Sequence, residues 1–132
     1  SKKEFEKYTM ELDKRGFLWI IHKNNVEFLM EDAIEFISHL KEICEDKKTP
    51  FLVDLRIKNW SASKKVREYA SNTPLEKIRV SEAILVDNFV IRFLVSMYIK
   101  VNKPPNPVKI FSNEEEAVEW SISFVQKRKL KD

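Results

Sequence analysis

The chain has 132 residues, which suits one domain with room for a sizeable core. Its formal net charge of +3 is too small to indicate nucleic-acid binding, because acidic residues are interleaved with the basic ones. The single glycine, Gly16, excludes a phosphate-binding P-loop and the glycine-rich turn of dinucleotide-binding domains.

The cysteine and histidine content argues against a metal or an organic cofactor. One cysteine, Cys44, permits no disulfide within the chain, so the sequence favours a reducing, cytoplasmic compartment. Cys44 itself is expected to be a small buried hydrophobe. His22 and His39 lie apart from each other and from Cys44. The start of the chain lacks the apolar core of a signal peptide, and the basic run 127–131 is expected to be a solvated helix end.

The first predicted elements form an antiparallel hairpin. Residues 8–12 and 17–22 read as strands, and Gly16 supplies a positive φ to the turn between them. Residues 26–28 are a candidate for a short third strand. Apolar residues then recur three and four positions apart, which predicts a helix from about 30 to 46.

The rest of the chain alternates between strands and helices. The predicted elements are a buried strand at 51–55, a loop at 57–65, a helix at about 62–71, an apolar strand at 83–86, a helix at about 88–101, a strand at 108–111 and a terminal helix. The Ser-x-x-Glu spacing of residues 112–115 predicts a capping box for that last helix. Together these elements predict a single α/β domain with a mainly parallel sheet, an antiparallel N-terminal hairpin at its edge and about four helices.

The order of these elements resembles the SpoIIAA-like fold, also called the STAS fold, of anti-sigma-factor antagonists. The more specific likeness is to uncharacterised bacterial proteins labelled STAS/SEC14-like. The residues that carry the resemblance are Glu31-Asp-Ala33, Leu52-Val-Asp54, Ser63-Lys64 with Arg67, Ala83-Ile-Leu-Val-Asp87 with Arg92, and Val108-Lys-Ile-Phe111 with Glu116-Ala-Val-Glu-Trp120. The resemblance covers nearly the whole chain and implies a non-enzymatic regulatory or protein-interaction module.

The resemblance also points to one serine. In phosphorylated relatives of this fold, the joint between strand and helix carries Asp-Ser-Ser-Gly, and its first serine accepts phosphate. Ser63 takes that place here, but Ala62, Lys64 and Lys65 replace the other three motif residues. Ser63 is therefore the candidate phosphoacceptor and gate of a docking surface formed by residues 57–65 and the following helix. A helix cap is the alternative role for this serine.

Basic and aromatic residues around this serine are candidates for contact with a partner or an anion: Trp60, Lys64, Lys65 and Arg67. Lys64 and Lys65 would favour a phosphate at the helix N-terminus. For Trp60 the alternative is packing over the second helix, and for Arg67 it is pairing with a nearby acid such as Glu68.

A second candidate site lies at the carboxyl ends of the parallel strands, where ligands gather in such sheets. Asp54, Arg56 and Asp87 fall on this rim, although caps and surface pairs are the alternative role for them. No nucleophile and base have a spacing that indicates catalysis, so the protein is not expected to be an enzyme.

The helix at 88–101 is apolar around nearly its whole circumference, and Arg92, Ser96 and Lys100 are the gaps. Its length and charges argue against a membrane span. A helix on a sheet needs one apolar stripe, so the surplus predicts a further contact. The expected contact is a homodimer, and the interface candidates are Phe89, Val90, Phe93, Leu94, Met97 and Tyr98. The alternatives are burial by the C-terminal segment, or an apolar cavity beneath this helix for a small ligand or lipid.

Overall fold

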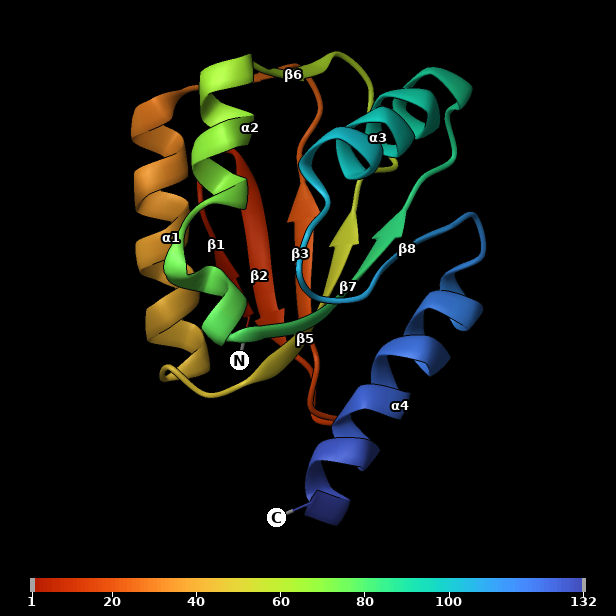
Figure 1. Ribbon diagram of the computed structural model, residues 1–132. Helices are drawn as coiled ribbons and strands as arrows, with labels where there is room; N and C mark the ends of the chain where they lie inside the picture. The colour runs from red at the N-terminus through yellow and green to blue at the C-terminus, as the bar shows by residue number, and fades with distance from the viewer. Residues whose placement is uncertain (1, 132) are drawn as a thin grey trace.

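The computed structural model describes residues 2–131, with the side chains of all of them except Pro74 and residues 126–131. The side chains of the basic run 127–131 therefore lie outside the described part. The described residues form one six-stranded sheet in the order β1-β2-β3-β5-β7-β8 (Figure 1). Its strands are β1 (Lys2–Glu4), β2 (Tyr8–Leu12), β3 (Leu18–His22), β5 (Thr49–Asp54), β7 (Arg79–Leu85) and β8 (Val108–Phe111).

The first three strands are antiparallel, and the last four are parallel to one another. The predicted hairpin is confirmed, and Gly16 turns it with a φ of 103°. β1 was not predicted, because its three residues are charged and exposed and only pairing with β2 makes them a strand. The mainly parallel sheet with an antiparallel N-terminal edge is confirmed.

Helices connect the parallel strands, as predicted. The described helices are α1 (Met30–Cys44), α2 (Lys64–Ser71), α3 (Phe89–Asn102), α4 (Glu114–Lys131) and the short 3-10 helix η1 (Pro74–Lys77). The capping prediction for α4 was wrong by one residue. Asn113 Oδ1, and not Ser112, accepts a hydrogen bond from the Glu116 backbone N–H at 3.0 Å. Among these helices, none combines the length and the hydropathy that crossing a membrane requires.

The core has two parts, one on each face of the sheet. On one face α1, α2 and η1 cover β2, β3 and β5, and α1 contributes Ala33, Ile37, Leu40 and Cys44. Cys44 is buried, as predicted, and its burial raises the pKa of the thiol. On the other face α4 covers β5, β7 and β8 through Ala117 and Val118. α3 contributes no buried residue to either part.

Candidate functional site

Two short strands form a second sheet beside the main one. β4 (Val26–Phe28) pairs in parallel with β6 (Trp60–Ala62). Strand 26–28 was predicted, but residues 60–62 were assigned to a loop. A segment of three residues is too short to show the alternating pattern of a strand. Residues 60–62 form β6 because β4 supplies their hydrogen-bonding partner.

Asparagines fasten the amino ends of this pair. Asn25 and Asn59 both adopt a positive φ, at 57° and 55°, which asparagine tolerates better than most residues. Asn59 Nδ2 donates to Asn25 Oδ1 at 3.1 Å, and the Lys58 backbone N–H donates to Asn24 Oδ1 at 2.8 Å. The turn before β4 and the turn before β6 are therefore joined by one hydrogen bond between side chains and one between a side chain and the backbone.

The carboxyl ends of the pair lead directly into helices. β4 is followed by α1 and β6 by α2, so two helix N-termini lie beside each other above the paired strands. Asp32 caps α1, because its Oδ2 accepts a hydrogen bond from the Leu29 backbone N–H at 2.8 Å. The same oxygen forms an ion pair with Lys7 Nζ at 2.6 Å. Ser63 caps α2, because its Oγ accepts from the Val66 backbone N–H at 3.3 Å.

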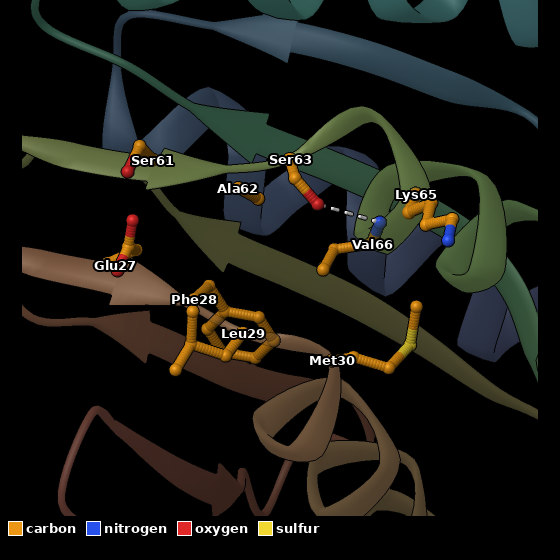
Figure 2. Close-up of a pocket in the computed structure, with 9 residues that line it drawn as sticks. All are labelled: Glu27, Phe28, Leu29, Met30, Ser61, Ala62, Ser63, Lys65 and Val66. Carbon is orange, nitrogen blue, oxygen red and sulfur yellow. Dashed lines mark hydrogen bonds between the residues drawn. The ribbon is translucent and has the colours of Figure 1, made fainter.

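An open hollow of about 320 Å³ lies between these two strand–helix joints. We call it the Ser63 hollow. Figure 2 shows segment 27–30 along one side and segment 61–66 along the other. Its lining is apolar at Phe28, Leu29, Met30, Ala62 and Val66, and polar at Glu27, Ser61, Ser63 and Lys65. Ser63 itself is exposed at the N-terminus of α2.

The basic candidates on α2 make few polar contacts with other residues. Lys64 and Lys65 are exposed, and Lys64 Nζ lies 3.9 Å from Glu68 Oε1. Arg67 donates from Nη1 to the Ala62 backbone carbonyl rather than pairing with an acid. A surface pair like that of Lys64 contributes little to stability.

Trp60, the first residue of β6, is half-buried. Its ring centroid lies 5.2 Å from that of His22 and 5.8 Å from that of Phe28, so its main contacts are with the core. His22 is also surrounded by Tyr8 and Phe36. Burial lowers the pKa of His22 to about 4. Its Nδ1 and the Nε1 of Trp60 have no hydrogen-bond partner among the described residues. In the sequence His22 looks isolated, because the aromatic residues around it come from segments far apart in the chain.

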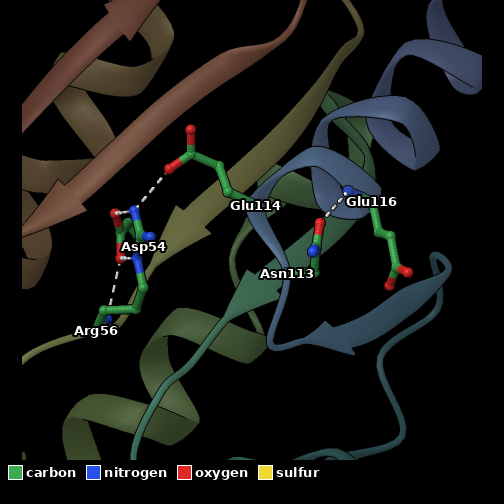
Figure 3. A network of polar contacts seen from close by, with 5 residues as sticks. All are labelled: Asp54, Arg56, Asn113, Glu114 and Glu116. Atoms are coloured by element: carbon green, nitrogen blue, oxygen red, sulfur yellow. Dashed lines mark hydrogen bonds and ion pairs between the residues drawn. The ribbon is translucent and has the colours of Figure 1, made fainter.

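The strand-end rim is an ion-pair network (Figure 3). Asp54 is buried and accepts from Arg56 Nε at 3.0 Å and from Arg56 Nη2 at 2.8 Å. Arg56 Nη2 also donates to Glu114 Oε1 at 2.9 Å, and the side-chain hydrogen bond that Arg56 donates to Asp54 raises the Arg56 pKa. Asp87 is exposed and lies at a second, polar hollow of about 310 Å³ together with Arg56 and Lys58. The rim thus brings Asp54 and Arg56 together as a structural pair.

The interface candidates of α3 lie on its surface. Phe89 is 84% exposed and Phe93 58%, and Val90, Leu94 and Met97 are exposed as well, whereas Tyr98 is half-buried. Neither hollow described above is an enclosed apolar cavity beneath this helix. Within residues 2–131, no three histidine, cysteine or acidic side chains are grouped so that they could hold a metal ion.

Comparison with known proteins identifies a family and supports the fold. The sequence model of the family described as "Domain of unknown function (DUF7793)" matches residues 10–125. No curated protein matches the chain. The chain is similar to a crystal structure of an uncharacterized protein of the DUF3478 family from Shewanella loihica PV-4. That structure has a SpoIIAA-like fold, a TM-score of 0.63 and 16% identity, over 86% of this chain and 91% of that chain.

A structure of a protein with unknown function from Arthrobacter sp. FB24 covers 84% of this chain and 96% of its own, at 22% identity. Its TM-score is 0.30. The match to the Shewanella protein confirms the SpoIIAA-like fold that the order of elements predicted.

Proposed function

The chain belongs to the DUF7793 family, and we propose that it is a non-enzymatic regulatory module that docks a protein partner at the Ser63 hollow. The observation that carries the proposal is the position of Ser63. An exposed hydroxyl caps α2 at the edge of an open, largely apolar hollow. The proposed setting is the cytoplasm, since the lone buried thiol of Cys44 suits a reducing compartment.

The lining of the hollow supports docking of a short peptide segment. Its floor offers apolar contact through Phe28, Met30 and Val66, and its rim offers polar groups for a partner's backbone and charges. An apolar anchor surrounded by polar contacts is the usual composition of a protein interface. The hollow is open, which suits a segment of another protein better than an engulfed small molecule.

Ser63 is the proposed gate of this surface. A phosphoryl group on its Oγ would add a charge of about −1.5 to −2 at neutral pH. The N-terminus of α2 and the neighbouring Lys64 and Lys65 would stabilise that charge. The charged lining of the hollow would change from one residue of each sign, Lys65 and Glu27, to a net negative charge. Phosphorylation would therefore change which partner, if any, the hollow accepts.

We also propose that the module works as a homodimer. The support is the exposed apolar surface of α3, which a single copy of the chain leaves in water. A two-fold contact uses the same surface twice, so it is the simplest way to bury it.

Site-specific cross-linking in the native cell tests the docking site. A photo-reactive residue at Lys65, on the rim, should capture a discrete partner, whereas the same residue at Lys47, exposed in the turn after α1, should not. Ser63→Asp should change the amount captured at position 65, and intact-mass analysis should find a phosphorylated fraction that Ser63→Ala lacks. Equal capture at both lysines would refute the docking site, and absence of phosphate across growth conditions would refute the gate.

A further inference from the structure

α3 carries two apolar stripes on opposite sides. The inner stripe is half-buried and consists of Ile91, Val95, Tyr98 and Ile99. The outer stripe is exposed and consists of Phe89, Val90, Phe93, Leu94, Met97 and Val101. A surface helix normally turns polar residues outward, so one stripe has no role in the fold of a single copy.

The outer stripe has the shape of a helix-packing surface. Phe89, Phe93, Met97 and Val101 are four residues apart and form one continuous ridge along three turns. Val90 and Leu94 form a shorter second row, and a groove runs between the rows. Ridges of this four-residue spacing interdigitate with the same ridges of another helix in the commonest packing class of globular proteins. The stripe is therefore complementary in shape to a second copy of itself.

The area of the stripe fits a dimer contact. From their exposed fractions, these six side chains offer roughly 600 Å² of apolar surface. Two copies would then bury roughly 1,200 Å², which is the lower bound of standard specific interfaces. Flanking residues of α3 and of its C-terminal connector would add to this area.

Charge and polarity are compatible with self-association. The outer stripe contains no polar side chain, so two stripes in contact leave no buried polar group unpaired. Arg92, Ser96 and Lys100 form their own row beside the stripe, which lets both cations stay in water.

We infer that the outer stripe of α3 is the seat of a symmetric contact between two copies of this chain. This inference rests on the homodimer in the proposed function and names its interface. The central residues are Phe93 and Met97, because they lie midway along the ridge where a two-fold axis would cross it.

Sedimentation equilibrium and light scattering between about 1 and about 100 μM test this contact, a range that brackets a micromolar dissociation constant. The natural chain should approach twice the monomer mass at the upper end. Phe93→Glu should weaken association at least ~10-fold, as expected for a central interface residue. Ser96→Glu is the matched control, since it places the same charge on the same helix outside the stripe, and it should leave association unchanged.

Met97→Cys supplies an independent measurement. Oxidation should join it to the same residue of a second copy, and Ser96→Cys should cross-link far less. Phe93→Glu should also keep the far-UV circular dichroism and the melting temperature of the natural chain, because its side chain lies outside the core.

Each other outcome overturns a different statement. A natural chain that stays monomeric at about 100 μM refutes the homodimer as well as this interface. Binding of that monomer to anionic phospholipid vesicles, lost in Phe93→Glu, would assign the stripe to a lipid surface instead. A dimer that survives Phe93→Glu refutes the α3 interface but leaves the homodimer. None of these results bears on cross-linking at Lys65, which tests the Ser63 hollow separately.

Discussion

α1 and α3 are helices of similar length that differ in whether their apolar side chains are buried or exposed to water. α1 has 15 residues and α3 has 14. α1 buries Ala33, Ile37, Leu40 and Cys44 and presents mostly charged residues outward. α3 buries none of its residues and presents phenylalanine, leucine, valine and methionine outward. The single chain therefore buries one face of α1 completely and leaves the apolar residues of α3 partly or fully in water.

The sharpest test of this comparison truncates one apolar residue on each helix. Leu40→Ala removes a fully buried side chain of α1 and should lower the free energy of unfolding by about 2–5 kcal/mol. Phe93→Ala removes a larger side chain of α3 and should change that free energy by less than about 0.5 kcal/mol, because the ring is already in water. Urea unfolding at low micromolar concentration measures both. A loss at Phe93 as large as that at Leu40 would show that the outer stripe belongs to the core of the single chain.

Acid should lower the free energy of unfolding through His22, which is buried on the α1 side of the sheet. Its folded pKa is about 4 against an ordinary value of 6.5, because burial disfavours the charged ring. The unfolded chain binds the proton first, so stability is fully present above pH 6.5 and is lost as the pH falls toward 4. The loss from this group should be about 3 kcal/mol.

Urea unfolding at several pH values measures this loss. His22→Phe keeps an aromatic ring among Tyr8, Phe28, Phe36 and Trp60 and should flatten the dependence between pH 6.5 and 4. His39→Gln is the control variant and should retain the His22 dependence. An unchanged slope in His22→Phe would mean that other groups cause the acid sensitivity.

The smallest expected effect concerns the cap of α2. Ser63→Ala removes the acceptor of the Val66 N–H and should lower the free energy of unfolding by about 1 kcal/mol. Ser61→Ala, in β6 two residues before the cap, should cost less than about 0.5 kcal/mol. Equal costs at the two serines would remove the structural role of Ser63 and leave only its proposed regulatory one.

The sequence predicts well wherever periodicity or an apolar run extends over many residues. The α1 stripe, the buried strand before Arg56 and the surplus of apolar residues in α3 are all visible in this way. Their order is also what made the SpoIIAA-like fold predictable. Long elements reveal themselves because burial imposes the same requirement at every turn or every second residue.

The missed features depend on contacts between distant residues. β6 requires β4 as its partner, and the aromatic surround of His22 is assembled from β2, β4, α1 and β6. The predicted cap of α4 was Ser112 and the observed cap is Asn113. Both residue types cap helices, so the backbone geometry decides between them. Local sequence does not encode such choices.

The β4–β6 pair has a consequence for the order of folding. Its asparagine turns join residues 34 positions apart in the chain, and each strand contributes only three residues. A parallel pairing of this kind gains few hydrogen bonds for a large loss of chain entropy, so it should form after the main sheet has fixed both of its ends. Its amide protons should therefore exchange with solvent sooner than those of β5, through openings that leave the rest of the domain folded. The rim of the Ser63 hollow would then be the last part of the domain to form and the first to open.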